Sequence, residues 1–322
     1  VKIAYAPYSK NLSAPGDRRR FAFYANKRQI KYELADPKNI YDIVYLTYGC
    51  DLSAWIAYKK KNQSVKIVFE LIDSYLFEDD SLLMKSHISK KIQTASKGFI
   101  RYAIGRESKF FFNYKSALLQ MISISDAVVC STDLQRNDLL KLNNNVHISL
   151  DYFSDDITTH KKTHKVGSKI KLVWEGQPYT ASNLVLLNEV LKKIKNNVEV
   201  YVITDATANY YFNLYKVKIT KILKEFKFNY HFIPWDKENI SNIIASCDLA
   251  VIPIVPGDDF VWNKPENKLL FFWEIGIPTL TSNTPAYKRV MDIAGLDFHC
   301  SSSNEWLNKI QNFSNSSESD KQ

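Results

Sequence analysis

The sequence lacks the features that mark secreted, membrane-spanning and zinc-binding proteins. Its four cysteines, Cys50, Cys130, Cys247 and Cys300, lie far apart and share no CxxC spacing, which indicates a reducing compartment and no structural zinc. No run of about 18 apolar residues is present, so no transmembrane helix is expected. Residues 1–29 have no apolar core ahead of their charges, so no signal peptide is expected. These absences predict a cytoplasmic protein.

Acidic residues are scarce relative to basic ones. The chain has 43 lysines and arginines against 34 aspartates and glutamates, a net charge of +9. Such a field favours nucleic acid, anionic lipid or nucleotide phosphates as partners. No helix-turn-helix, zinc-finger or aromatic ribonucleoprotein signature is visible, so we expect no nucleic-acid partner. The GxGxxG fingerprint of dinucleotide-binding proteins is also absent.

What the sequence does contain is a repeated alternation of short β-branched or aromatic runs with longer helical ones. Strand-like runs occur at 2–8, 41–47 and 65–71, and again at 170–174, 198–204 and 249–254. This alternation is typical of doubly wound α/β domains, and 322 residues suit two of them. We predict an N-terminal domain over 1–155, a polar linker over 156–168, a C-terminal domain over 169–313 and a disordered tail over 314–322.

Residues 263–282 hold the strongest local pattern. A buried-looking strand precedes them, and a helix is predicted to begin near Pro265 and to end at Gly276. The start of such a helix lies at the carboxyl edge of a parallel sheet, where free N–H groups suit phosphate. Lys264 and Lys268 add two cations there. The alternative is an ordinary strand–helix–strand unit with solvated lysines.

Two segments of the first half carry candidate site residues. Gly16, Asp17, Arg18 and Arg19 follow the first strand and open a helix, so we expect them to face an acceptor or a diphosphate; a solvated basic helix start is the alternative. Asp73 follows the strand at 65–71, where a catalytic carboxylate would lie. Asp73 could instead cap the next helix.

The segment 82–120 combines many basic residues with aromatic ones and is helical in its periodicity. Basic and aromatic residues together indicate an interfacial segment that contacts anionic lipid or receives a lipid-linked acceptor. A helix pair that packs its aromatic residues into the core is equally consistent with the pattern.

The motif Lys264-x-x-Asn267-Lys268, followed by Gly276-x-Pro278, resembles the donor segment of GT-B fold glycosyltransferases of the bacterial surface-polysaccharide, group 1-like type. The resemblance implies two Rossmann-like domains that face a cleft. The retaining branch of the family often carries a Glu-x7-Glu pair here, a spacing that Glu266 and Glu274 share. Aligned on Gly276-x-Pro278, however, the family pair falls on residues 263 and 271.

The resemblance also implies roles for individual residues. The turn at Gly176 and Gln177 resembles a donor-phosphate loop, yet no basic residue occurs from 172 to 191, so Lys264 and Lys268 are expected to supply the charge. The predicted donor-binding residues are Gly176, Gln177, Thr204, Trp235, Lys264, Asn267, Lys268 and Glu274. The predicted catalytic residues are Asp73, Asp17 and Glu266, and the predicted acceptor- or phosphate-binding residues are Gly16, Arg18 and Arg19.

The resemblance therefore implies a hexosyltransferase-like enzyme that needs neither metal nor cofactor. It would move a sugar from a nucleotide-sugar donor to a hydroxyl of a glycan or lipid-linked acceptor in surface polysaccharide biosynthesis, at the inner face of the cell membrane. The glutamate spacing favours retention of the anomeric configuration. The alternatives are a sugar-nucleotide 2-epimerase of the same fold and a non-catalytic subunit that binds a partner or the membrane.

Overall fold

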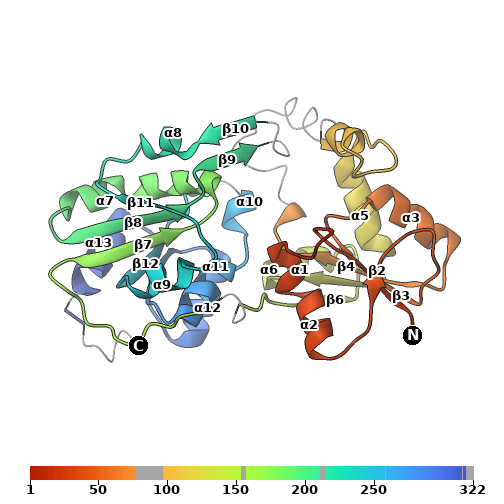
Figure 1. Ribbon diagram of the computed structural model, residues 1–322, viewed down its shortest axis with the longest axis horizontal. Coiled ribbons are helices and arrows are strands. Elements are labelled where there is room, and N and C mark those ends of the chain that lie inside the picture. The colour runs from red at the N-terminus through yellow and green to blue at the C-terminus, as the bar shows by residue number, and fades with distance from the viewer. Residues whose placement is uncertain (77–96, 154–156, 211–214, 258, 314, 317–322) are drawn as a thin grey trace. The chain divides into compact units, whose positions relative to one another are not determined.

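The computed structural model describes residues 1–76, 97–153, 157–210, 215–257, 259–313 and 315–316. The chain forms two compact units (Figure 1). The first unit comprises Val1–Tyr152 and Gly257–Pro265, and the second comprises Phe153–Pro256 and Glu266–Gln322. The predicted tail, 314–322, lies almost entirely outside the described residues.

The first unit is built on a six-stranded sheet with the strand order β2-β1-β3-β4-β5-β6, in which every pairing is parallel. Parallel strands need crossover connections, and the helical runs between them supply these. The strands are β1 (Ile3–Ala6), β2 (Glu33–Leu34), β3 (Ile43–Thr47), β4 (Lys66–Leu71), β5 (Ala127–Cys130) and β6 (Val146–Ile148). The helices are α1 (Pro15–Arg18), α2 (Phe21–Lys27), α3 (Leu52–Lys61), α5 (Tyr114–Ile124), α6 (Asp133–Leu139) and α10 (Asp259–Trp262).

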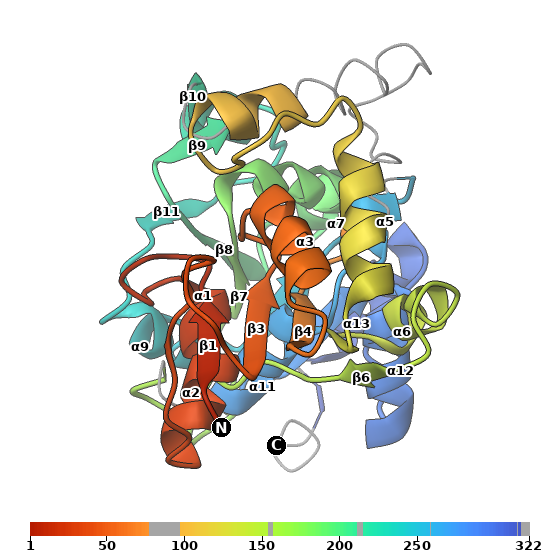
Figure 2. The ribbon, with the colours of Figure 1, turned by 90° about the vertical axis from the view of Figure 1, so that its right-hand side faces the viewer.

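The main core of this unit lies between the sheet and two of its helices. Helices α3 and α5 lie side by side (Figure 2). Trp55 on α3 and Met121 on α5 are buried against Leu46 and Phe69 of the central strands. Asp51 and Asn113 cap the two helices by accepting from the backbone N–H groups of residues 54 and 116.

The arginine run at 18–20 places its third member in the protein interior. Arg20 is fully buried, and its Nε donates to Glu70 Oε1 at 2.7 Å. Its Nη1 donates to Asp151 Oδ1 at 2.8 Å and to Ser131 Oγ at 3.2 Å. Arg20 therefore ties the start of α2 to the ends of β4 and β5 and to Asp151, which lies just before the chain enters the second unit.

The second unit repeats the architecture with the strand order β11-β8-β7-β12-β13-β14, again wholly parallel. A separate antiparallel hairpin joins β9 to β10. The strands are β7 (Ile170–Glu175), β8 (Val198–Thr204), β9 (Thr207–Tyr210), β10 (Tyr215–Lys218), β11 (His231–Pro234), β12 (Leu249–Ile252), β13 (Thr279–Ser282) and β14 (His299–Cys300). The helices are a 3₁₀ segment at Pro178–Leu187, α7 (Asn188–Lys193), α8 (Ile219–Leu223), α9 (Ile240–Ala245), α11 (Asn267–Ile275), α12 (Pro285–Ala294) and α13 (Ser303–Phe313).

The predicted linker at 156–168 is not a free connection, because it packs on the second unit. Ile157 is buried in that unit's core. The Lys161 backbone N–H donates to the Ile275 carbonyl at 2.7 Å, and the Lys161 ammonium donates to the Cys247 carbonyl at 2.6 Å. Polar composition suggested a linker, whereas these backbone contacts make the segment part of the second unit. The second unit also starts earlier than predicted, at Phe153.

The segment 82–120 is only partly described, and its described part combines both interpretations of the sequence. Residues 97–103 are helical, and Phe99, Tyr102 and Phe112 are exposed. Arg101 is buried instead, where it pairs with Glu107 at 2.9 Å and donates to the Cys50 carbonyl. At least one basic residue of the segment therefore has an internal structural role.

We predict that Arg20→Met lowers the free energy of unfolding by about 3–5 kcal/mol, because it leaves the buried Glu70 and Asp151 without their cation. Urea unfolding of the purified chain measures the change. Arg28→Met is the matched control: Arg28 is exposed and directly follows α2, the helix that Arg20 precedes. This substitution should change stability little. Equal effects of the two substitutions would contradict the structural role of Arg20.

We also predict that Asp126 contributes to stability in a pH-dependent way. Burial alone would raise its pKa, but hydrogen bonds from the Lys59 ammonium, the Ile67 N–H and the Lys66 ammonium outweigh burial and lower the pKa to about 2. A carboxylate with a lowered pKa stabilises the fold above its unfolded pKa, and this stabilisation is lost as the pH falls through the folded value. Asp126→Asn should therefore cost about 2 kcal/mol at neutral pH and flatten the loss of stability below about pH 5.

Urea midpoints measured across that pH range test the Asp126 prediction. Asp138→Asn removes a surface pair with Lys141 instead, and such pairs contribute little. An unchanged acid limb in Asp126→Asn would show that the lysines do not stabilise the carboxylate.

Candidate active site

The carboxyl edge of the second sheet gathers most of the predicted donor-binding residues. Since all its pairings are parallel, the turns after β7, β8, β11 and β12 meet at one edge. From β7 the chain adds β8 and then β11 on one side of β7, and it then returns to add β12 on the other side. Ligands of open α/β sheets bind at such a switch point. The turn after β7 contains Gly176 and Gln177, and α11 begins after β12.

The lysine of the first turn of α11 lies directly on the Gly176 turn. A Cβ atom at position 176 would overlap the Lys268 amine, so a side chain there would displace the end of the lysine from the turn. The amine also lies 4.9 Å from the centre of the Trp174 ring, within the range of a cation–π contact. The sequence has no basic residue around this turn, and the structure brings Lys268 to it from 92 positions away along the chain.

Glu266 is buried, whereas its predicted catalytic role requires a carboxylate that the substrate can reach. It precedes α11 as the N-cap residue, is fully buried and forms an ion pair with Arg289 of α12. Burial, and then the nearby Glu266 charge, raise the pKa of the Tyr287 hydroxyl. The carboxylate therefore fixes the start of α11 against α12. Arg289 was not singled out in the sequence, because nothing in its local pattern indicates a partner.

The other predicted donor residues differ in their accessibility. Thr204 ends β8, is fully buried, and its hydroxyl has no hydrogen-bond partner among the described residues. Trp235 follows β11, donates its backbone N–H to the Thr204 carbonyl at 3.1 Å and keeps 39% of its surface exposed. Gln177 is exposed, and its carbonyl accepts from the Thr180 hydroxyl at 2.8 Å. Trp235 is therefore partly exposed at the same carboxyl edge of the sheet as Gly176.

Asn267 and Glu274 occupy opposite ends of α11. The Asn267 Oδ1 atom is buried at the first turn and accepts no hydrogen bond from the described residues. Glu274 is exposed in the last turn, where the carbonyl of the same residue accepts from His160 Nδ1. Eight residues of helix separate Glu274 from Glu266 by about 12 Å. The structure therefore does not bring Glu274 to the site at the helix start.

In the first unit, Asp73 and Lys264 meet. Asp73 follows β4, and its Oδ2 lies 3.0 Å from the Lys264 ammonium, with about a quarter of each side chain exposed. The neighbouring Ser74 hydroxyl donates to the Phe260 carbonyl of α10 at 2.5 Å. The segment Gly257–Pro265 thus packs on the end of β4. The Asp73 carboxylate also accepts from the Ser74 N–H at 2.9 Å. Asp73 therefore contacts both Lys264 and the serine that donates to α10.

Asp17 stabilises the loop after β1 rather than facing outwards. It is fully buried and accepts from the Tyr5 hydroxyl at 2.7 Å, the Tyr8 N–H at 2.8 Å, and the Ser9 N–H and hydroxyl at 2.9 and 2.8 Å. These four donors occupy both oxygens of the carboxylate. The geometry gives Asp17 a structural function in place of the predicted catalytic one.

The remaining residues of that loop are also closely packed. A Cβ atom at Gly16 would come within 2.6 Å of the Tyr8 ring, so glycine is required there for close packing. Arg18 and Arg19 are half-buried, and burial lowers the pKa of Arg18. The Arg19 carbonyl accepts from the Tyr152 N–H at 3.0 Å.

Across the described ranges, no three histidine, cysteine, aspartate or glutamate side chains gather closely enough to hold a metal ion. None of the helices in the described part of the chain combines the length and the hydropathy that crossing a bilayer requires.

Comparison with known proteins identifies the fold. No protein-family model and no curated protein sequence matches the chain. Anabaena Alr3699/HepE, solved with UDP and glucose, is similar with a TM-score of 0.57 and 10% identity, over 96% of this chain and 89% of that one. WaaG, a glycosyltransferase involved in lipopolysaccharide biosynthesis, gives a TM-score of 0.52 and 13% identity, over 98% and 90%.

A third similar structure is considerably longer than this chain. S. aureus TarM, solved with fondaparinux, α-GlcNAc-glycerol and UDP, has a TM-score of 0.52 and 11% identity over 91% of this chain. The match spans only 51% of TarM, about half its length. These likenesses confirm the predicted fold: the chain has the two Rossmann-like units of GT-B glycosyltransferases.

Proposed function

We propose that the chain transfers a sugar from a nucleotide-sugar donor to a hydroxyl of a glycan or lipid-linked acceptor. The observation that carries the proposal is the Lys268 amine against the Gly176 turn, at the switch point of the second sheet. The fold is shared with HepE, which was solved with UDP and glucose, and with the glycosyltransferase WaaG. We place the reaction in surface polysaccharide biosynthesis, at the cytoplasmic face of the membrane.

The chemistry of the site suits a leaving diphosphate. As the bond between the sugar and the diphosphate breaks, negative charge develops on the phosphate oxygens. Lys268 and the free N–H groups at the start of α11 would stabilise that charge. The Thr204 hydroxyl and the Asn267 carboxamide are buried polar groups that a donor's hydroxyls would pair with. A hexosyltransferase of this design uses lysine charge in place of a metal ion.

The structure supports the donor half of the proposal more than the acceptor half. Asp73 is the remaining predicted carboxylate with partial exposure, and its Oδ2 contacts Lys264. To orient an acceptor hydroxyl or to take its proton, Asp73 would have to exchange this contact for the acceptor. Retention was inferred from the Glu266 and Glu274 spacing, and it stays a prediction; Glu266 is fully buried and paired with Arg289.

A non-catalytic binding subunit is the second candidate, and one observation favours it. Asp17 and Glu266 are both fully buried and engaged in structural contacts, which leaves Asp73 alone among the predicted catalytic residues. Turnover with an added acceptor separates the two functions. A sugar-nucleotide 2-epimerase would instead convert the donor without any acceptor.

Thermal unfolding of the purified chain against UDP-, GDP-, CMP- and dTDP-sugars should show a shift with one nucleotide, because a ligand at 100 times its Kd adds about 2.7 kcal/mol. Lys268→Gln should weaken that binding about tenfold or more, since charge-assisted hydrogen bonds contribute about 1.5–3 kcal/mol. Lys193→Gln, at an exposed position of α7, serves as the control of equal charge.

Gly176→Ala gives an independent test of the same site. The added methyl group should displace the Lys268 amine and weaken donor binding by a factor similar to that of Lys268→Gln. If donor binding survives both substitutions, the donor does not lie at this turn. The pattern in which Gly176→Ala acts and Lys268→Gln does not would assign the effect to turn geometry rather than to charge.

A further inference from the structure

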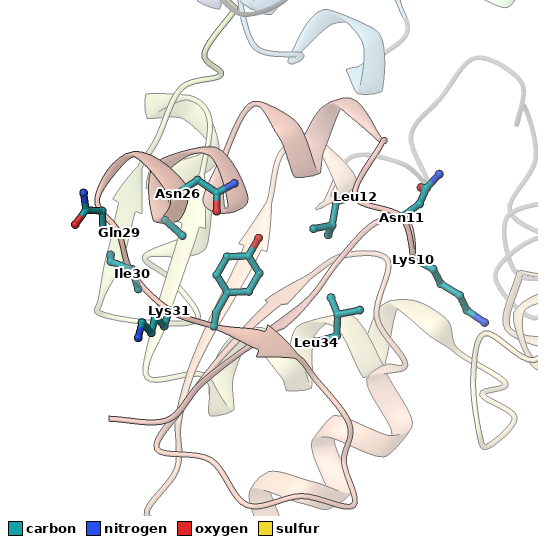
Figure 3. A pocket seen from close by; sticks show the side chains of 10 residues that line it. Lys10, Asn11, Leu12, Asn26, Gln29, Ile30, Lys31 and Leu34 are labelled. Carbon is teal, nitrogen blue, oxygen red and sulfur yellow. The ribbon is translucent and has the colours of Figure 1, made fainter.

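A groove in the first unit is lined by none of the site residues assigned so far. It runs between the loop after β1, the end of α2 and strand β2, with a volume of about 820 Å³ (Figure 3). Small-molecule sites span about 300–1,000 Å³, so the groove is large enough for a ligand of several rings. The residues that line it include Lys10, Leu12, Asn26, Gln29, Lys31 and Leu34.

The groove has polar ends and an apolar middle. Figure 3 shows one end formed by Lys10 and Asn11, the other by Asn26, Gln29 and Lys31, and Leu12 and Leu34 between them. Carboxamides both donate and accept hydrogen bonds, so they match hydroxyl groups. Leu34 keeps 52% of its surface exposed and Ile30 keeps 42%, which leaves aliphatic surface for a ligand to cover.

The charge of the groove has one sign. None of its ten lining residues is acidic, while Lys10 and Lys31 provide a cation at each end. Glu33, the acid within the adjoining strand, pairs instead with Lys2 at 3.1 Å. An occupant with negative charge near both ends is therefore favoured over a neutral one.

Backbone strain concentrates at the same place. Leu12 has φ of 58° and Gln29 has φ of 55°, and within the described residues these are the two non-glycine positions with positive φ. The left-handed conformation is unfavourable for residues with a side chain, because the Cβ atom approaches the following carbonyl oxygen. Strain of this kind clusters at ligand sites, where the surrounding structure holds it in place.

We propose that this groove binds an acidic glycan. The apolar faces of the sugar rings lie on Leu12 and Leu34, the hydroxyls pair with the carboxamides, and carboxylate or phosphate groups meet Lys10 and Lys31. The inference rests on the proposed function, because it makes this glycan the acceptor chain and names the acceptor as anionic. A peptide strand added to the sheet edge is disfavoured, since β2 has only two residues and presents few backbone groups.

Calorimetry with the full chain tests the proposal with three tetrasaccharides. Tetragalacturonate provides carboxylates, maltotetraose phosphorylated on C6 provides phosphates, and unmodified maltotetraose is the neutral control. We expect at least one charged probe to bind about tenfold or more tighter than maltotetraose, with an affinity that falls as salt rises. The probe that binds identifies which anionic group the groove prefers.

Paired substitutions locate the binding. The double variant Lys10→Gln, Lys31→Gln should weaken the charged probe about tenfold. The double variant Lys60→Gln, Lys61→Gln removes the same charge from the end of α3 and should leave binding unchanged. Leu34→Glu, at an exposed position, should weaken binding of the charged probe through repulsion within the groove.

Three results would overturn the proposal: no binding of either charged probe, equal binding of maltotetraose, or equal losses in the two lysine double variants. Thermal shifts with nucleotide-sugars distinguish this failure from failure of the proposed function. The Lys10→Gln, Lys31→Gln variant should keep its donor response, and Lys268→Gln should keep its tetrasaccharide binding.

Discussion

Parallel pairing of the strands is the constraint on which the rest of the structure depends. Every pairing within the two six-stranded sheets is parallel, so each crossover returns the chain to the same edge and every post-strand turn lies there. Residues far apart in sequence therefore meet without any specific attraction between them. Gly176 lies in the turn after β7 and Lys268 lies at the start of α11, the helix between β12 and β13, and the pairing of β7 with β12 makes them neighbours.

Glycine then determines how closely these turns approach. A Cβ atom at Gly16 would collide with the Tyr8 ring in one unit, and a Cβ atom at Gly176 would collide with the Lys268 amine in the other. Neither glycine belongs to a GxGxxG motif. The chain uses a single glycine at each turn for close approach, and a lysine from another element supplies the charge that the turn itself lacks.

The sequence predicted the fold well because the relevant signals are local. Strand-like runs separated by helical ones give two α/β units regardless of detailed contacts, and Gly276 followed by Pro278 marked the end of α11 correctly. Burial of charged groups could not be predicted in this way. Three consecutive arginines look alike in sequence, yet Arg20 enters the core because Glu70 and Asp151 lie there, 50 and 131 positions away. The same limit applies to Asp17, whose four donors identify its structural function only in the folded chain.

The spacing of Glu266 and Glu274 shows why a motif must be judged with its position in a helix. A helix of nine residues follows Glu266, so one glutamate precedes the helix and the other lies in its last turn. Only the first can act at the positive end of the helix dipole. There, Glu266 is buried against Arg289 and fixes α11 relative to α12, which holds the first turn of α11 in a constant position. Because Lys268 belongs to that turn, the buried ion pair supports the site indirectly: it orients the helix start whose lysine lies on the Gly176 turn.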